Sequence, residues 1–295
     1  MKILMLGKTG QVGAALTPLL RQLAGSSADE AVVTLGRADV DLSDAAALVQ
    51  AVQRVQPSLI VNAAAHTAVD RAETEPDIAF AINAVAPGVL AEQAAKLDAL
   101  LVHYSTDYVF DGSQRTPYRE SDPTHPLGVY GESKLAGEQA VQDSGCRHLL
   151  LRTSWVYDST GRNFLTTMLR LAKQHGKLRV VGDQHGSPTS AAMIAEASLQ
   201  LIRSMLNQPA MQGGLYHLTA QGQTTWHGFA QAIMHKAGLD IPIEAITTAD
   251  YPTPAKRPAY SVLDSSKLQR EFNYRLPDWR QALDALPALS SQQAA

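Results

Sequence analysis

Short apolar runs alternate with longer segments of helical character through the first half of the chain. The apolar runs lie at residues 2–6, 31–35, 58–61, 99–104 and 147–153. Runs of this length are typical of parallel strands that are buried on both faces. Segments with helical spacing or strong helix formers lie at residues 14–23, 44–55, 77–97 and 130–141. This alternation predicts an α/β fold with a doubly wound parallel sheet.

A glycine-rich turn directly follows the first predicted strand. Gly7, Gly10 and Gly13 have the spacing G-x-x-G-x-x-G, and a predicted helix begins after the last of them. Glycines let the backbone turn tightly and approach a ligand, and the helix N-terminus then faces a pyrophosphate. No Lys-Ser/Thr pair follows the last glycine, which excludes a P-loop. The turn predicts dinucleotide binding, and the alternative is a plain tight turn.

The end of the second predicted strand indicates which dinucleotide binds. In such folds this position meets the adenosine ribose, where an acid favours NAD and an Arg accommodates the 2′-phosphate of NADP. Here Gly36 and Arg37 follow the strand, and the first acid is Asp39. The sequence therefore favours NADPH, with Arg37 as a simple surface cation being the alternative.

The pattern loosens beyond residue 156. We predict helices at residues 163–175, 191–206 and 224–237, short strands at 178–181 and 214–218, and a proline-rich segment at 242–261. The chain is long enough for two domains. We expect a dinucleotide-binding domain at residues 1–156 and a smaller, mainly substrate-binding α/β lobe at residues 157–295, with segments near 178–218 returning to the sheet.

Tyr130 and Lys134 should share one face of a helix because they are four residues apart. An ammonium one turn away favours the phenolate and so lowers the pKa of Tyr130. A Tyr tuned in this way can exchange a proton with a carbonyl or an alcohol. Chance Tyr-x-x-x-Lys pairs are common on solvated helices, so the position of this one matters. Thr106 and Trp155 follow predicted strand ends, and all these side chains should face the crevice beyond the sheet.

Composition excludes several classes of function. The chain has 295 residues, 45% hydrophobic content and a net charge of −3, which gives no basic footprint for nucleic acid. Its one cysteine, Cys146, excludes an internal disulfide and is expected to be a packed thiol in a reducing compartment. We find no apolar run near the ~20 residues that span a membrane and no signal peptide, so we expect a cytoplasmic protein.

Five motifs taken together resemble the extended short-chain dehydrogenase/reductase family, and most closely its dTDP-4-dehydrorhamnose reductases. The motifs are GKTGQVG, NAAAHT, HYSTDYVFDG, Tyr130-x-x-x-Lys134 and RTSWVY, and the similarity continues to Arg257-Pro258. The resemblance implies a Rossmann fold with NADPH, or alternatively NADH, as cofactor. It also implies reduction of the C4 ketone of dTDP-4-dehydro-L-rhamnose to dTDP-L-rhamnose, a step toward the rhamnose of cell-surface polysaccharide.

The resemblance implies a role for each matching residue. Tyr130 would protonate the C4 oxygen, Lys134 would hold the nicotinamide ribose, and Thr106 would position the sugar oxygen. With the glycine turn and Arg37, the expected cofactor-binding set is Gly7, Gly10, Gln11, Val12, Gly13, Arg37, Asp41, Leu42, Ala65, His66, Thr67, Tyr104, Tyr130 and Lys134. The expected substrate-binding set is Thr106, Asp107 and Trp155.

Partners of the chain are predicted from the same resemblance. Some reductases of this family bind magnesium between subunits through glutamates, and the positions that match two of these are Ala15 and Ala192. Alanine has no side-chain oxygen for a hard cation. We therefore predict no metal and a monomer or weak homodimer, with a nucleotide sugar as substrate and neither nucleic acid nor membrane as partner.

Other proteins of related sequence leave alternatives open. Sugar-nucleotide dehydratases of this fold carry Thr-Asp-Glu, whereas this chain has Thr106-Asp107-Tyr108, and Tyr108 cannot replace the carboxylate base. Epimerases of this fold share Tyr-x-x-x-Lys and keep NAD bound through the cycle. The regulatory subunit of methionine adenosyltransferase also resembles this chain and acts by binding its partner rather than by turnover.

Overall fold

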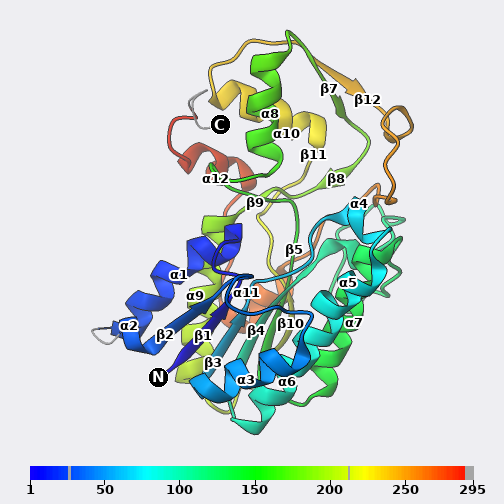
Figure 1. Cartoon of the computed structure of the whole chain (residues 1–295). Helices are drawn as coiled ribbons and strands as arrows, with labels where there is room; N and C mark the ends of the chain where they lie inside the picture. Colours follow the sequence, from blue (N-terminus) through cyan, green and yellow to red (C-terminus); the bar gives the residue numbers. More distant parts are fainter. Residues whose placement is uncertain (26–27, 212, 290–295) are drawn as a thin grey trace.

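A parallel sheet of six strands forms the centre of the molecule (Figure 1). The computed structural model describes residues 1–25, 28–211 and 213–289. The strands are β1 (Ile3–Leu6), β2 (Val32–Leu35), β3 (Leu59–Asn62), β4 (Leu100–Thr106), β5 (His148–Thr153) and β10 (Gly213–His217). Their order is β10-β5-β4-β3-β1-β2, with every neighbouring pair parallel. The strand order reverses between β1 and β3: β2 lies on one side of β1, and the later strands follow on the other side. Such a switch point opens a crevice at the carboxyl ends of the two strands.

Helices cover both faces of this sheet, so the predicted doubly wound fold is confirmed. One face carries α1 (Gln11–Ala24), α2 (Ala28–Ala31) and α9 (Ala191–Asn207), and the other carries α3 (Ala45–Val55), α6 (Ala86–Lys96) and α7 (Val129–Asp143). Successive strand residues point to opposite faces. Ile3 and Met5 therefore pack in one apolar core with Leu16 of α1, while Leu4 packs in the other with Leu48 of α3.

A smaller lobe lies beyond the carboxyl ends of the strands (Figure 1). Its larger elements are α8 (Phe164–Gln174), β7 (Leu178–Val181), α10 (Trp226–Lys236), β12 (Ile243–Ile246) and α12 (Trp279–Ala285). Strands β7 and β12 pair in parallel, apart from the central sheet. Two elements from the second half of the chain belong to the sheet domain instead, because α9 packs against α1 and β10 pairs with β5.

The predicted helix at residues 77–97 is one helical segment, Pro76–Lys96, with a π-helical stretch at its centre. It begins as α5 (Pro76–Phe80), becomes π-helical over η2 (Ala81–Val85) and continues as α6. Contrary to the sequence expectation, the segment is long and apolar enough to cross a membrane. More than half of its most apolar window is buried inside the fold, and it packs against α3 and α7, as a core helix does.

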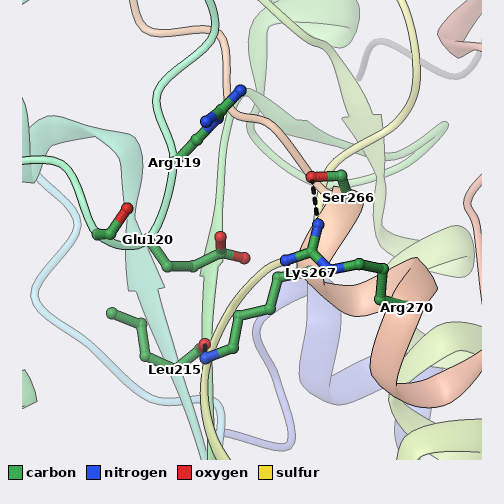
Figure 2. A pocket seen from close by; sticks show the side chains of 7 residues that line it. Arg119, Glu120, Leu215, Ser266, Lys267 and Arg270 are labelled. Atoms are coloured by element: carbon green, nitrogen blue, oxygen red, sulfur yellow. Dashed lines mark hydrogen bonds between the residues drawn. The ribbon is translucent and has the colours of Figure 1, made fainter.

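The free edge of β10 is covered by two side chains of opposite charge (Figure 2). Glu120 accepts a hydrogen bond from the backbone N–H of His217 at 2.8 Å, and the Lys267 ammonium donates to the carbonyl of Leu215 at 2.9 Å. Such contacts prevent an edge strand from pairing with another chain. A cavity of about 550 Å³ lies here, next to α11 (Ser266–Phe272), and none of the predicted site residues lines it.

Helix α7 packs against the π-helical stretch without room for a side chain at Gly137. A Cβ added there would overlap the backbone carbonyl oxygen of Asn83. We expect Gly137→Ala to lower the free energy of unfolding by about 1–3 kcal/mol through overpacking, although alanine favours a helix. The measurement is equilibrium denaturation. Gly176→Ala is the matched control, because no heavy atom lies within 4 Å of a Cβ there, and equal stabilities of the two variants would contradict this packing.

Candidate active site

The glycine turn lies between β1 and α1 and packs on the segment that follows β3. Gly7 has a φ of +87°, and a Cβ at this position would lie 2.7 Å from the carbonyl carbon of Ala63. A Cβ at Gly13 would overlap the carbonyl oxygen of Gly7. Gly10 caps α1 without a side-chain hydrogen bond, so the first amides of the helix remain available to an anion. The turn thus fits the pyrophosphate of a dinucleotide.

The ribose end of this crevice holds two cations, Lys8 and Arg37, and two acids, Asp39 and Asp41. The carboxylate of Asp39 accepts from the N–H of Gly36 at 2.7 Å and lies 2.6 Å from the Lys8 ammonium. The hydrogen bond with Lys8 lowers the pKa of Asp39 below its ordinary value. The neighbouring Arg37 is exposed. Lys8 thus occupies Asp39, and the exposed Arg37 is left as the predicted partner of a 2′-phosphate.

The remaining predicted cofactor residues follow strand ends or begin a helix. Gln11 and Val12 begin α1, Asp41 and Leu42 follow β2, and Ala65, His66 and Thr67 follow β3. Asn83 of the π-helical stretch holds His66 by its backbone, with bonds of 2.8 Å from the N–H and 3.0 Å to the carbonyl. Tyr104 differs from the others because its hydroxyl is buried and donates to Ser198 of α9 at 2.7 Å. The backbone carbonyl of Tyr104 instead accepts a hydrogen bond from Lys134 at 2.6 Å, so Tyr104 meets the site through its backbone.

Thr106 and Tyr130 meet at the carboxyl end of β4. Thr106 is the last residue of the strand and caps the short helix η3 (Asp107–Val109), accepting from the N–H of Tyr108 at 3.2 Å. Tyr130 is in the first turn of α7, and the Thr106 hydroxyl lies close enough to its phenol to oppose part of the rise in its pKa. Its ring packs edge-on against Tyr108, with ring centroids 5.5 Å apart. The structure thus brings the predicted proton donor and the predicted hydroxyl together.

Lys134 lies one turn further along α7, but its ammonium group is not the influence on Tyr130 that the sequence suggested. Burial raises the pKa of Tyr130 above its ordinary value, and the nearby Thr106 hydroxyl offsets this only in part. Burial also lowers the pKa of Lys134 to about 8. The Lys134 nitrogen donates to the Tyr104 carbonyl at 2.6 Å and lies 3.2 Å from His103 Nε2. The predicted fall in the pKa of Tyr130 is therefore wrong, because desolvation outweighs charge here.

Asp107 is a buried carboxylic acid beside this pair. Its side chain is 2% exposed and accepts from the Thr106 hydroxyl at 3.1 Å. Burial raises the pKa of Asp107 to about 6, and the neighbouring hydroxyls of Ser261 and Thr106 oppose the rise. Its Oδ2 atom has no hydrogen-bond partner among the described residues. An oxygen of this kind is ready to bind a polar group of a substrate.

Trp155 stacks on another indole instead of standing alone in the crevice. Its ring lies parallel to that of Trp226, with centroids 3.5 Å apart and an interplanar angle of 5°. Trp226 is anchored by a 3.1 Å hydrogen bond to Gln184. Trp155 also has a φ of +48°, a strained value for this residue. Gly186 also packs against Trp155, because a Cβ there would overlap the indole ring, so only part of Trp155 remains accessible to a sugar.

Two groups near the site escaped the sequence interpretation. Arg257 bridges the lobes by donating to the Tyr108 hydroxyl at 3.0 Å and to Asp70 at 2.9 Å. His103 and Asn62 are buried neighbours of Lys134, joined to each other at 3.1 Å. In the sequence, Arg257 is noted only as part of the Arg257-Pro258 motif, and no role is predicted for it. The signal for His103 was a polar residue inside an apolar strand, which alone does not specify a role.

The positions that match the metal ligands of relatives lie on α1 and α9. Ala15 is half-buried on α1, and Ala192 is exposed on α9. Within residues 1–25, 28–211 and 213–289, no group of three or more His, Cys, Asp or Glu side chains could hold a metal ion. The predictions of no metal and of a monomer or weak homodimer stay predictions.

Known proteins resemble this chain over nearly its whole length. A family model described as the RmlD substrate binding domain matches residues 1–290. The dTDP-4-dehydrorhamnose reductase of Salmonella typhimurium strain LT2 is 46% identical over 285 residues, which is 95% of this chain and 94% of that protein. The crystal structure of such a reductase from Clostridium acetobutylicum has a TM-score of 0.87 and 36% identity, covering 96% of this chain and 97% of its own. A Bacillus anthracis structure in complex with NADP has a TM-score of 0.86 and 32% identity, with the same coverage.

The raised pKa of Asp107 makes stability depend on pH. Because the folded state holds its proton up to about pH 6, against an ordinary pKa of 3.8, stability falls as pH rises between about 4 and 6. The difference corresponds to about 3 kcal/mol. We expect the stability of Asp107→Asn relative to the unmodified chain to increase by about this amount from pH 4 to pH 7 in denaturant titrations. Asp240→Asn, at an exposed carboxylate, should show no such trend, and a flat difference for Asp107→Asn would contradict the assignment.

Proposed function

Because this chain belongs to the RmlD substrate binding domain family, we propose that it is an NADPH-dependent dTDP-4-dehydrorhamnose reductase. It reduces the C4 ketone of dTDP-4-dehydro-L-rhamnose and forms dTDP-L-rhamnose. The observation that carries this function is the placement of the Tyr130 phenol beside the Thr106 hydroxyl at the carboxyl end of β4. A protonated phenol and a hydroxyl, aimed at one crevice, are what an incoming ketone needs on its oxygen.

The cofactor site is built from the residues of the sheet domain. Bound NADPH supplies the hydride that goes to C4 of the sugar. The amides that follow Gly10 hold the pyrophosphate, and Arg37 holds the 2′-phosphate. Lys134 and the segment around His66 line the nicotinamide half. The Bacillus anthracis relative, whose crystal structure contains NADP, supports this choice of dinucleotide.

Proton transfer is the work of the chain's own side chains. Tyr130 gives its phenolic proton to the C4 oxygen as the carbonyl becomes an alcohol. Thr106 donates to or accepts from the same oxygen and aligns it with the phenol. Burial keeps Tyr130 protonated at neutral pH, since it raises the pKa of the phenol. Asp107 and the accessible part of Trp155 bind the sugar nucleotide.

The two parts of the chain divide these tasks. We infer that residues 1–156, completed by α9 and β10, bind the dinucleotide, and that the rest of residues 157–295 binds the sugar nucleotide. We infer that the enzyme is cytoplasmic. We also infer a monomer or weak homodimer, because Ala15 and Ala192 stand at the positions that match metal-binding glutamates of some relatives. Epimerases of this fold, such as that of Thermus thermophilus, are only 20% identical, so the likeness to them concerns the fold alone.

Replacing the phenol tests the role of Tyr130. We expect Tyr130→Phe to lower kcat by about 10²–10⁴-fold while the Kd of NADPH changes little, because the lost hydroxyl acts in the transition state. The assay follows NADPH oxidation with dTDP-4-dehydrorhamnose generated in situ. Tyr251→Phe is the matched control, since Tyr251 is 61% exposed. Near-normal turnover by Tyr130→Phe would refute this role.

Replacing the guanidinium tests the choice of dinucleotide. We expect Arg37→Gln to raise the KM for NADPH by about tenfold, which is the loss of one charge-assisted contact of about 1.4 kcal/mol. The KM for NADH should stay the same, because NADH has no 2′-phosphate, so each preparation carries its own control. Equal increases for both cofactors would show that Arg37 does not contact the phosphate.

A further inference from the structure

Helix α7 begins without a capping side chain of its own. Its N-cap is Gly128, which makes no side-chain hydrogen bond, and the residue three positions later is Gly131. The first amides of a helix are normally satisfied by Ser, Thr, Asn or Asp at the N-cap, with Glu or Gln three residues later. Helices α3, α8 and α9 follow this rule, with the N-caps Asp44, Asn163 and Ser190. The start of α7 therefore needs an acceptor from elsewhere in the chain.

The carboxylate of Glu73 supplies this acceptor from a position 56 residues earlier in the chain. Glu73 Oε1 accepts from the N–H of Val129, the first residue of α7, at 3.0 Å. The carboxylate also lies directly against the N-cap, because a Cβ on Gly128 would overlap Glu73 Oε1. A carboxylate is a strong acceptor, and its negative charge is favoured at a helix N-terminus. Glu73 thus replaces the cap that the sequence of α7 lacks.

Close packing explains why α7 cannot carry this cap itself. A glutamate has no room at position 131, because a Cβ there would overlap the carbonyl oxygen of Tyr108. A side chain at position 128 would displace Glu73. Helix α1 also begins at a glycine, but its first amides remain available to an anionic ligand. In α7 the corresponding place is already taken by a carboxylate of the same chain.

Tyr130 is the residue between two fixed points in this first turn. On one side, Val129 is held through its N–H by Glu73. On the other side, Gly131 packs on the carbonyl of Tyr108. The backbone of Tyr130 is therefore held from both directions. Such precision matters for catalysis, because a misplacement of about 1 Å can lower a reaction rate by about 10²-fold.

Glu73 is itself held in place, because it directly follows the short helix α4 (Val69–Ala72). Asp70 of this helix accepts from the guanidinium of Arg257 at 2.9 Å. It also accepts from the N–H of Ala255 at 3.3 Å. Both partners belong to the last part of the chain, so α4 is tied to a segment other than α7. The carboxylate that caps α7 is thus presented by an anchored element.

We propose that Glu73 is a positioning residue, whose carboxylate holds the first turn of α7 so that the Tyr130 phenol meets the ketone oxygen of the substrate. The proposal deepens the reductase function given above and rests on it. Glu73 acts on the backbone of α7 and exchanges no proton with the substrate. Loss of its hydrogen bond should therefore lower kcat, while the sheet domain still binds NADPH.

Two variants remove this hydrogen bond in different ways, and a third retains it. Glu73→Ala removes the carboxylate, whereas Gly128→Ala displaces it with a methyl group and keeps its charge. Both should lower kcat about 10–100-fold with little change in the Kd of NADPH. Glu73→Gln keeps an acceptor oxygen and should retain kcat within about threefold. Glu132→Ala is the matched control, because it removes an exposed carboxylate from the same turn, and it should leave kcat unchanged.

A double-mutant cycle separates positioning from a general effect on folding. If Glu73 acts through the phenol, Glu73→Ala should lower kcat by less than about twofold in a Tyr130→Phe background, because the group that it positions is absent. Losses that multiply would overturn the proposal. An unchanged kcat in either Glu73→Ala or Gly128→Ala would also overturn it, as would equal losses in Glu73→Ala and Glu73→Gln.

Hydrogen exchange tests the contact itself and needs no substrate. The amide of Val129, followed by NMR, should exchange slowly in the unmodified chain and in Glu73→Gln, and at least about tenfold faster in Glu73→Ala. Fast exchange in the unmodified chain would overturn the proposal whatever the activity. Slow exchange without any ketosugar reduction by the unmodified chain would refute the reductase, and the positioning role with it, while the hydrogen bond would stand.

Discussion

Helix α7 reaches the carboxyl edge of the sheet because two of its glycines let backbone meet backbone. Gly131 packs on the carbonyl of Tyr108, and Gly137 packs on that of Asn83, where no Cβ would fit. Between these contacts Ser133 accepts a hydrogen bond from Asn83 at 3.1 Å. A wider separation would withdraw Tyr130 from Thr106, which is fixed at the end of a fully buried strand. The geometry of proton transfer is therefore set by close packing of a helix on its neighbours.

Burial then determines the charges that this geometry presents. Glu138 is only 2% exposed and has a bidentate hydrogen-bonding partner in Arg152. Lys134 is equally buried, but its nitrogen bonds to a carbonyl and an imidazole. Burial penalises the charge of an ammonium, so the pKa of Lys134 falls to about 8. The same burial raises the pKa of Tyr130, so desolvation acts on both members of the pair Tyr130 and Lys134.

Local features of the sequence were sufficient to predict the frame of the molecule. Apolar runs of four to seven residues became β1 to β5, and the glycine turn lies between β1 and α1 as expected. These features depend on neighbours in the chain, so periodicity and glycine spacing report them. The convergence of Thr106 and Tyr130 also followed, because strand ends of a parallel sheet share one edge.

Contacts between residues far apart in the chain were beyond such reasoning. The stack of Trp155 on Trp226 joins positions from a strand end and a later helix, and no spacing rule connects them. Likewise the π-helical stretch that places Asn83 looks like ordinary helix in the sequence. The pKa of Tyr130 was predicted with the wrong sign, because the sequence shows the charge of Lys134 but not the burial of both groups. In each case the missing information was a contact or a degree of burial that depends on residues far apart in the chain.

The residue after Asp107 shows how one position can change the chemistry of a shared fold. Dehydratases that resemble this chain have a glutamate there, and a carboxylate can take a proton from carbon. Tyr108 instead packs its ring on Tyr130, and its hydroxyl accepts from Arg257, which is itself paired with Asp70. Burial raises the pKa of Tyr108, so it stays a neutral phenol and offers no base. With no base at that position, the site retains one proton donor aimed at one oxygen, and reduction is the reaction such an arrangement supports.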